Sequence, residues 1–369
     1  NGTGVASAVA GSNGGLFTVN ANGTASFDAN GEFADLAVGE TRATEVVYQI
    51  DDGNGGTDTA VITYTVTGEN DPVTPVIPGD PNPPADPSNY IPAQTGTDNA
   101  AVTSFNLTPY FMDADTNDTI TLSVNQAALP SGLSFDAATG IISGTPDADA
   151  SQNAVNGIYT IPVTATDGNG STFTTNVIYT ISNPAPTAQN DAISGTESDT
   201  AAAFDVLANN GSGLDSDPDG DTLGVTRVMS GNDVAALGTV LDGANVGLPV
   251  AGSMGGIFTI LPDGSATFDA NGEFDDLAVG ESRVTEVVYQ ISDGEGGSDT
   301  AVVTYTVTGE NDPVTPVVPG DPNAPADPLN YIPAQTGTDS VATTPLDLTP
   351  YFTDTDSSDT ITLSITPAD

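Results

Sequence analysis

The chain of 369 residues contains no lysine, histidine, cysteine or tryptophan, and its basic residues are three arginines. Without His or Cys it offers no imidazole base, no thiolate nucleophile and no zinc site of the usual type. Without Lys it forms neither a Schiff base nor a P-loop. A carboxylate-pair hydrolase is the remaining enzymatic alternative, but most carboxylates stand in short Gly- and Asn-rich loops, a poor setting for a raised pKa. The sequence predicts a protein that is not an enzyme.

The charge is almost entirely of one sign. Asp and Glu number 50, and the formal net charge is −47. Binding of nucleic acid requires cations that neutralise phosphates, so we expect no nucleic-acid partner. The same charge opposes docking on an anionic membrane, and no apolar run of about 18 residues predicts membrane insertion. Two explanations of the acidity stay open: a solvated surface like that of halophile proteins, and bound cations.

The absence of cysteine also means that no disulfide stabilises the chain. Its length is sufficient for about two to four domains, each with its own core. Stability is therefore expected to come from several β cores and from bound ions.

A repeat with a period of 241 residues is the strongest internal signal. GGLFTVNANGTASFDANGEFADLAVGE from Gly14 returns as GGIFTILPDGSATFDANGEFDDLAVGE from Gly255, and YIPAQTGTD at Tyr90 returns at Tyr331. Residues 1–128 correspond to 242–369 without a gap. The chain thus holds about one and a half copies of a two-domain unit, which predicts a section of a longer array.

Alternating patterns predict strands throughout. In Thr59–Thr67 one face carries Ala60, Ile62, Tyr64 and Val66, and the other is mostly threonine, as in a half-buried strand. The same alternation is found in three further segments, and Gly-rich loops join paired strands as hairpins. The three segments are 300–308, 159–165 and 173–181, and the loops are 51–58, 293–299 and 167–171. Helical patterning is confined to a short turn near Asp233–Leu237, so we expect an all-β chain of tandem β-sandwiches.

Two stretches between these sandwiches carry proline at every third residue. The positions are Pro72, Pro75, Pro78, Pro81, Pro84 and Pro87, and again Pro313, Pro316, Pro319, Pro322, Pro325 and Pro328. Polyproline II has three residues per turn, so each set forms one stripe along a segment of about 50 Å. The segment is either a semi-rigid spacer or a stripe that docks lengthwise on a neighbouring domain or chain.

Long motifs carry a resemblance to known families. GLFTVNANGTASFDANGEF, DLAVGE and VVYQIDDGNGGTDTAVITYTVTGEND, within Gly14–Pro72 and again within Gly255–Pro313, resemble the VCBS-type repeat of large bacterial RTX-type adhesins. NDAISGTESDTAAAFDVLANNGSGLDSDPDGDTL (190–223) resembles the opening of a bacterial cadherin-like domain. LTPYFMDADTNDTITLS, LPSGLSFDAATGIISGTP and YTIPVTATDGNGSTFTTNVIYTISN, within residues 90–183, resemble cadherin-like and Putative Ig domains.

The resemblance implies an all-β fold of tandem Ig/cadherin-like β-sandwiches joined by Pro-rich polyproline II linkers. The expected segments are a partial VCBS-type sandwich (1–71), a linker (72–88), a cadherin-like/Putative Ig sandwich (89–183), a complete VCBS/cadherin-like sandwich (184–312), a second linker (313–329) and a partial cadherin-like/Putative Ig sandwich (330–369).

The resemblance also implies a structural extender or fibre-forming repeat of a secreted bacterial adhesin, rigidified by calcium, with a role in adhesion, biofilm or filament architecture. The expected location is extracellular or on the bacterial cell surface, and the expected partners are neighbouring repeats or copies of the same chain in a fibre. Two alternatives remain: a carbohydrate-binding module within an adhesin, and a surface-layer or sheath component. A surface or glycan ligand is a further expected partner, bound elsewhere in the parent protein.

Short acidic loops are the candidate sites for several Ca²⁺ ions, because calcium prefers six to eight carboxylate and carbonyl oxygens. Clustered carboxylates without a cation repel one another. In cadherin-like domains such loops combine with residues at domain junctions, and ordinary Asx turns are the alternative explanation. The predicted ligands are Asp113, Asp115, Asp118, Asp167, Asp215, Asp217, Asp219, Asp221, Asp354, Asp356, Asp359, Glu69, Asp71, Glu310 and Asp312.

Overall fold

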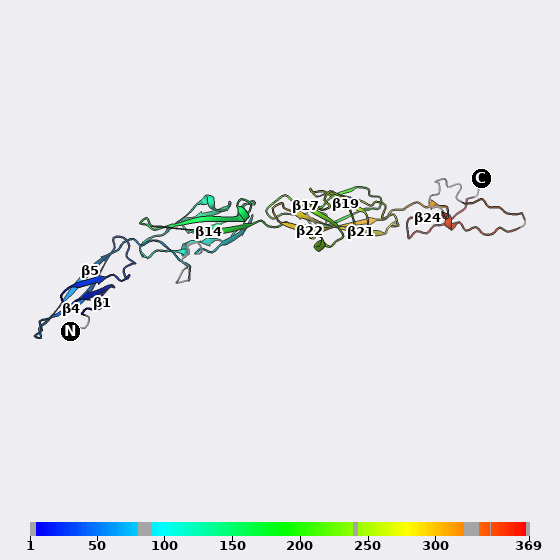
Figure 1. Ribbon diagram of the computed structural model, residues 1–369. Coiled ribbons are helices and arrows are strands. Elements are labelled where there is room, and N and C mark those ends of the chain that lie inside the picture. The colour runs from blue at the N-terminus through cyan, green and yellow to red at the C-terminus, as the bar shows by residue number, and fades with distance from the viewer. Residues whose placement is uncertain (1–4, 80–89, 239–242, 321–331, 340, 367–369) are drawn as a thin grey trace. The chain divides into compact units, whose positions relative to one another are not determined.

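The computed structural model describes residues 5–79, 90–238, 243–320, 332–339 and 341–366. The chain divides into two compact units, Asn1–Asn183 and Pro184–Asp369, which run from blue to green and from green to red in Figure 1. Within the described ranges, no helix is both long enough and apolar enough to cross a membrane.

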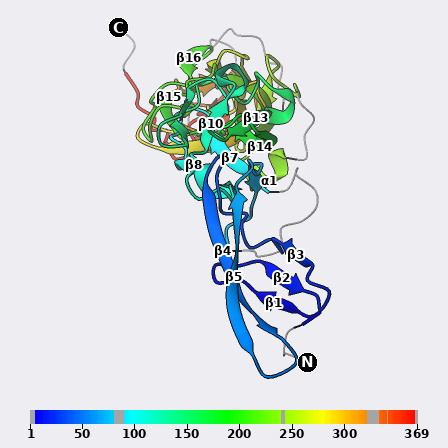
Figure 2. The same cartoon turned by 90° about the vertical axis from the view of Figure 1, so that its left-hand side faces the viewer.

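The first part of unit 1 is a small sheet beside a long hairpin (Figure 2). The sheet contains β1 (Ala8–Ala10), β2 (Leu16–Val19) and β3 (Ala25–Asp28), and the hairpin contains β4 (Thr41–Asp51) and β5 (Thr57–Thr67). Phe17 lies between them and is 1% exposed. The predicted strand and its Gly-rich hairpin loop are confirmed. The predicted inner face of β5 is only partly buried: Tyr64 stacks on Phe27 but is 48% exposed.

The second part of unit 1 is a β-sandwich. One sheet has the order β10-β13-β14-β7 and the other β11-β12-β8. The strands are β7 (Gln94–Thr97), β8 (Phe105–Asn106), β10 (Thr121–Val124), β11 (Leu133–Asp136), β12 (Ile141–Gly144), β13 (Ile158–Thr166) and β14 (Thr172–Ser182). Ile142, Ile161, Val177 and Tyr179 are buried between the sheets. Their alternation along the strands is the pattern that the sequence predicts.

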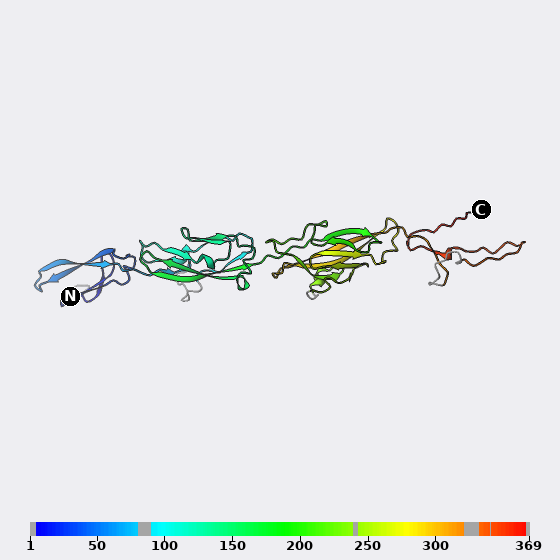
Figure 3. The same ribbon diagram turned by 90° about the horizontal axis from the view of Figure 1, so that it is seen from above.

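Unit 2 begins with a sandwich to which the described residues contribute eight strands (Figure 3, green to orange). One sheet has the order β15-β22-β21-β17, and the other β16-β20-β19-β18. The strands are β15 (Asp191–Thr196), β16 (Ala202–Asp205), β17 (Gly224–Ser230), β18 (Val250–Ala251), β19 (Ile257–Ile260), β20 (Ser265–Asp269), β21 (Ser282–Ser292) and β22 (Ser298–Thr308). The predicted short helical turn is α1 (Val234–Leu237), which Asp233 caps with its carboxylate. The predicted all-β sandwich class is confirmed.

The start of each Pro-rich stretch joins the domain that follows it. β6 (Thr74–Pro75) pairs with β9 (Phe111–Met112), and Val73 is 3% exposed. The second copy repeats this pairing between β23 (Thr315–Pro316) and β24 (Phe352–Thr353). The later prolines of both stripes (Pro81, Pro84, Pro87, Pro322, Pro325 and Pro328) lie outside the described residues, so the polyproline II spacer stays a prediction.

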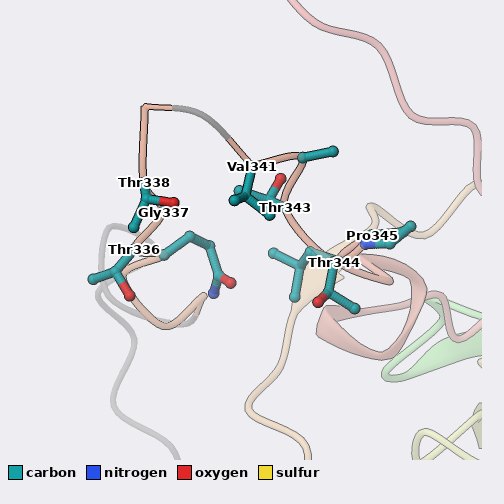
Figure 4. A pocket seen from close by; sticks show the side chains of 10 residues that line it. Thr336, Gly337, Thr338, Val341, Thr343, Thr344 and Pro345 are labelled. Atoms are coloured by element: carbon teal, nitrogen blue, oxygen red, sulfur yellow. The ribbon is translucent and has the colours of Figure 1, made fainter.

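The described residues from 332 on correspond to the beginning of the second sandwich of unit 1, and among them β24 is the strand that forms. A cavity of about 470 Å³ lies here and is lined entirely by the segment from Gln335 to Leu346 (Figure 4). The equivalent residues 94 to 105 contribute β7, which pairs with β14 in the first copy. Leu346 is 41% exposed, so this cavity is an open loop rather than a preformed binding site.

Candidate metal sites

A tight acidic loop recurs in both copies of the repeat. The amide of Asp115 donates to Oδ1 of Asp113 at 3.0 Å, and the amide of Asp118 donates to the carbonyl oxygen of Asp115 at 3.1 Å. In the second copy the amide of Asp356 donates to Oδ1 of Asp354 at 3.2 Å. These local hydrogen bonds are the Asx turns that the sequence allows. They leave other carboxylate oxygens of the loop available for a ligand.

The first junction cluster, formed by Asp71, Asp113, Asp115, Asp118 and Asp167, assembles three distant parts of unit 1. Carboxylate oxygens of Asp113, Asp118 and Asp167 lie within 4.8 Å of one another. Asp167 comes from the β13–β14 hairpin loop, and the amide of Asp71 donates to Oδ2 of Asp115 at 2.9 Å. Three of the predicted ligands thus converge, and Asp115, in the same loop, accepts the backbone contact from Asp71.

Several oxygens of the first junction cluster are buried without a hydrogen-bond donor. Among the described residues, Oδ2 of Asp113, Oδ1 of Asp115 and Oδ1 of Asn70 have no partner, although each is fully enclosed. The side-chain nitrogen Nδ2 of Asn70 donates to Oδ2 of Asp167 at 3.1 Å. This contact orients the side chain, and its oxygen Oδ1 is left without a described donor. Buried oxygens without donors are costly unless a ligand satisfies them.

The electrostatics of the cluster follow from burial and from like charges. Burial raises the pKa of Asp113 above its ordinary value, and the carboxylates of Asp115, Asp167 and Asp118 add to the rise. Burial also acts on Asp167, but hydrogen bonds from Asn70 and from the backbone amides of its own hairpin loop outweigh it and hold its pKa low. Asp167 is therefore a preformed anion within the cluster.

The second junction cluster, formed by Glu197, Asp312, Asp354, Asp356 and Asp359, repeats this arrangement in unit 2. Carboxylate oxygens of Asp354, Asp356 and Asp359 lie within 4.8 Å of one another. The amide of Asp312 donates to Oδ2 of Asp356 at 3.1 Å. Asp356 is 2% exposed and its Oδ1 is buried without a partner among the described residues.

Glu197 is a member of this cluster that the sequence analysis missed. Its Oε1 accepts a hydrogen bond from the amide of Glu310 at 2.7 Å, and its Oε2 is buried without a described partner. Burial raises its pKa, and the nearby charges of Asp312, Asp356 and Asp275 raise it further. No spacing rule links Glu197 to residues more than 100 positions later, so only the fold identifies it.

The third cluster is the loop formed by Asp217, Asp219 and Asp221 in unit 2, whose carboxylates lie within 4.8 Å of one another. Burial raises the pKa of Asp219 to about 7, with added repulsion from Asp217 and Asp221. Hydrogen bonds from the loop amides and from Asp219 outweigh burial at Asp217 and hold its pKa low. One proton shared between two adjacent carboxyls is the expected state of such a pair without a cation.

Three predicted ligands are placed differently from the rest. Asp215 is 5% exposed and points into the sandwich, where it accepts hydrogen bonds from the amide of Gln189 at 2.6 Å and from the hydroxyl of Tyr289 at 3.0 Å. Glu69 is exposed. The carboxylate of Glu310 accepts a hydrogen bond from the hydroxyl of Ser198. These three side chains belong to none of the three clusters.

The donor set of the three clusters is chemically uniform. Every side chain in them supplies oxygen, which hard cations prefer over zinc or copper. Two of the three arginines are paired with aspartates elsewhere, Arg42 with Asp35 and Arg283 with Asp276. A hard cation from solution is therefore the natural counter-charge for these carboxylates.

Three family models match consecutive parts of the chain. Residues 1–65 match the bacterial Ig domain, residues 82–182 the Putative Ig domain and residues 183–309 the bacterial cadherin-like domain. The predicted kinship with bacterial cadherin-like and Putative Ig domains is confirmed. For the first segment the matching family is a bacterial Ig domain, and its finer assignment as a VCBS-type repeat of an RTX-type adhesin stays a prediction.

A curated protein of Rhizobium johnstonii, named calcium-binding lectin RapA2, is 35% identical over 150 residues. The match covers 39% of this chain and 56% of that protein, so the chain spans little more than half the length of this relative.

Among solved structures, Drosophila N-cadherin EC1-4 is 18% identical with a TM-score of 0.29, covering 81% of this chain and 66% of that one. Mouse cadherin-23 EC22-24 is 13% identical with a TM-score of 0.35, covering 82% and 84%. These scores are too low to define the fold, which rests on the strand pairings above.

Proposed function

The chain is built from bacterial Ig, Putative Ig and bacterial cadherin-like domains, and on that premise we propose that it is a calcium-stiffened extender of a secreted bacterial surface adhesin. Its role is mechanical: it sets the distance between a cell surface and whatever the parent protein binds, in adhesion, biofilm or filament architecture. The domain families are those of adhesion modules rather than of catalysts. Their usual setting also supports an extracellular location.

One observation carries the proposal: the same buried acidic arrangement stands in both copies of the repeat. Oδ2 of Asp115 accepts a hydrogen bond from the amide of Asp71, and Oδ2 of Asp356 accepts the equivalent bond from the amide of Asp312. In Asp115 and in Asp356 the second oxygen, Oδ1, is buried without a described partner. A solvated surface would expose these oxygens to water. Their burial next to further carboxylates supports a bound cation instead of simple solvation.

Calcium is the cation that fits best. Each junction cluster offers several carboxylate oxygens, and the first adds the amide oxygen of Asn70, in line with the six to eight oxygen ligands that calcium takes. Magnesium demands a smaller octahedral shell and retains several waters. The name of the Rhizobium relative, a calcium-binding lectin, supports the same choice.

Binding at a junction would stiffen the array. In unit 1 the first cluster joins residues of the β4–β5 hairpin side (Asn70 and Asp71) to the following sandwich (Asp167 and Asp115). A ligand that binds only the assembled arrangement stabilises it by mass action, by about 2.7 kcal/mol when its concentration is 100 times the dissociation constant. Modules of this kind outside the cell bind calcium with dissociation constants of about 0.1 to 1 mM.

A calcium titration of thermal unfolding tests the proposal. The full chain is melted in EGTA, in millimolar CaCl₂ and in millimolar MgCl₂, and calcium alone should raise Tm by many degrees. Equilibrium dialysis with ⁴⁵Ca counts the bound ions independently of stability. Equal melting curves in the three buffers, with no retained ⁴⁵Ca, would refute calcium binding and favour simple solvation as the reason for the acidity.

Carbohydrate binding is the second candidate function, favoured by the lectin name of the Rhizobium relative. The cavity in Figure 4 does not support it, because its lining is a single exposed segment. A glycan array probed with the full chain in calcium distinguishes the two functions, since an extender binds no glycan.

Association of copies end to end or side by side in a fibre is part of the proposed role, and sedimentation of the chain at high concentration in calcium tests it.

A further inference from the structure

The sheet β10-β13-β14-β7 of the second sandwich carries no charged residue on any of its four strands. Charged residues make up 14% of the chain, and every other described sheet of three or four strands contains at least one. Asp98, Asp118 and Asp167 are close to these strands in the sequence but lie beyond their ends. A neutral sheet is therefore a local exception in a chain with a net charge of −47.

One side of this sheet faces the sandwich core and the other faces outward. The odd-numbered residues of β13 and β14 point inward, and Ile161 and Val177 among them are 0% exposed. The even-numbered residues point outward, because successive side chains of a strand alternate between its two faces. Ile158, on this outward side, is 48% exposed. The neutral face is the outward side of the sheet, and its exposed residues on β13 and β14 include Ile158, Pro162, Thr174 and Asn176.

Threonine and serine are the commonest residues of the neutral face, and several of their hydroxyls bond within the sheet. The hydroxyl oxygens of Thr164 and Thr174, which are opposite each other in the register, lie 2.9 Å apart. The hydroxyl of Thr121 donates to the carbonyl oxygen of Thr166 at 3.2 Å, and that of Ser123 donates to the carbonyl oxygen of Thr164 at 3.4 Å. Hydroxyls that already have a partner in the protein lose less when water leaves the surface.

Apolar and branched side chains lower the cost of covering this face further. Ile158, Pro162 and Ile178 interrupt the threonine rows of β13 and β14. Ordering a long charged side chain costs about 1.5–2 kcal/mol, whereas a branched aliphatic one costs about 0.5–1 kcal/mol. Since the face contains no long charged side chain, a partner that docks on it orders little that was free before.

The charge of the chain favours a second copy as that partner. Two copies with a net charge of −47 repel each other wherever charged faces approach. Contact between two neutral faces avoids this repulsion, and sheets commonly pack face to face at a spacing of about 10 Å. A twofold axis is sufficient for such a contact, because the same surface then serves both copies.

The corresponding sheet of unit 2, β15-β22-β21-β17, is less suited to this contact. On its outward side Arg227 lies opposite Gln290, and Glu286 lies opposite Thr304. The neutral face is thus a property of the second sandwich and not of the sandwich fold in general.

We propose that the neutral face is the lateral contact between two copies of this chain, packed sheet on sheet. The inference rests on the proposed association of copies and identifies its surface. The face contains no residue of the three acidic clusters, so the contact forms with calcium and without it.

The size of the face predicts a weak contact. Strands lie about 4.8 Å apart and rise about 3.3 Å per residue, so the face measures about 15–20 Å by about 30 Å. Two such faces bury about 1,000 Å² in total, which is the low end for specific interfaces. An array of 241-residue repeats would carry the face once per repeat, and many weak contacts between two arrays would then reinforce one another.

Sedimentation equilibrium of the full chain over a range of concentrations measures the contact. A monomer–dimer equilibrium should be found both in CaCl₂ and in EGTA. The dimer should become more stable when NaCl is raised from about 20 mM to about 500 mM, because salt screens the repulsion between the copies. A dimer held by ion pairs would weaken instead, and that result would contradict a neutral interface.

Asn176→Asp adds one charge to the face with almost no change of shape. Asn176 is exposed, so the monomer should keep its fold, but the dimer would bury two like charges and should weaken by at least about a hundredfold. Asn106→Asp is the matched control on β8 of the opposite sheet. Asn106 is also exposed, and an aspartate keeps the Oδ1 that accepts from the amide of Thr108 at 2.9 Å. This variant should dimerise as the unaltered chain does.

Ile158→Thr tests the same face without a charge. It removes apolar area from both copies and should weaken the dimer by at least about tenfold. Circular dichroism and Tm show whether each variant is folded, so a lost dimer can be separated from a lost fold.

Three results would overturn the proposal. A chain that stays monomeric at every concentration would also remove fibre association from the proposed role, while ⁴⁵Ca binding decides the calcium part separately. A dimer that Asn176→Asp and Ile158→Thr leave unchanged would keep the association but place it on another surface. A neutral glycan that binds the monomeric chain, and that Asn176→Asp no longer binds, would make a polysaccharide the occupant.

Discussion

Asp115 accepts a hydrogen bond from the backbone amide of Asp71, 44 residues earlier, and Asp356 accepts the same bond from Asp312 in the next copy. The bond connects the end of one domain to the acidic loop of the next. It uses one carboxylate oxygen of each aspartate and leaves the other buried without a described donor. Protein contacts thus hold each junction in place without an ion, and its clustered carboxylates carry negative charge that a cation would balance.

Asp115→Asn should remove most of the calcium response of unit 1. An amide can keep the hydrogen bond from Asp71 through its oxygen, but it supplies no charge to a cation. We expect a smaller calcium-induced rise in Tm and the loss of at least one ⁴⁵Ca per chain. Glu45→Gln, which removes an exposed charge outside the clusters, is the control and should retain the full response. An unchanged ion count in Asp115→Asn would contradict a role for this aspartate as a ligand.

Without calcium the chain should become less stable as the pH rises. The pKa values of Asp191 and Asp219 are raised to about 7, each chiefly by burial. A carboxyl whose pKa is higher in the folded state than in the unfolded state binds its proton more tightly when folded, so stability falls as pH rises from about 4 to about 7. The lowered pKa of Asp217 acts only at more acidic pH.

Thermal melts in EGTA at pH 5 and pH 8 measure this effect. Tm should be lower at pH 8, and millimolar CaCl₂ should reduce the difference because a cation replaces the missing protons at the acidic loop. Asp191 lies outside that loop and should retain its own smaller dependence. A Tm that rises between pH 5 and pH 8 in EGTA would contradict the assigned directions of the pKa shifts.

Tyr289→Phe should destabilise unit 2, whereas Tyr48→Phe should have little effect on unit 1. The two tyrosines are equivalent in the repeat, but Tyr289 is 0% exposed and its hydroxyl reaches Asp215 and two backbone carbonyls. Removing that donor leaves buried acceptors unsatisfied, at a cost of about 1–3 kcal/mol. Urea unfolding followed by circular dichroism measures both variants. Equal losses in the two would show that the hydroxyl contacts are not the cause.

Gly157→Ala should destabilise the second sandwich of unit 1 strongly. Gly157 has a φ of +66°, and a Cβ there would lie 1.9 Å from the carbonyl oxygen of Ile181, so both the backbone conformation and the space exclude a side chain. Gly168, in the β13–β14 hairpin loop, has open space at the Cβ position, and Gly168→Ala is the matched control. Urea unfolding should show a loss of more than about 1 kcal/mol for the first variant and a small change for the second.

Most of the local structure follows from the sequence alone. The alternation in residues 59–67 and 173–181 predicts the strands that are observed, and the short helical turn expected near Asp233–Leu237 is α1. The acidic loop at Asp113–Asp118 is also readable, because Asx turns depend on neighbours within a few residues. The composition, acidic and without His, Cys or Lys, also argues against most kinds of catalysis and is consistent with cation binding.

Burial and the membership of the clusters were decided by the tertiary structure. Tyr64 and Tyr305 have the same sequence surroundings, but one is half exposed and the other buried, since burial depends on whether β15, β16 and β17 lie alongside. Tertiary contacts also place Glu197 near Asp356. They direct Asp215 toward the hydroxyl of Tyr289 and away from its neighbours in the acidic loop. A pattern within a strand determines which side chains share a face, but contacts between distant segments determine what that face meets.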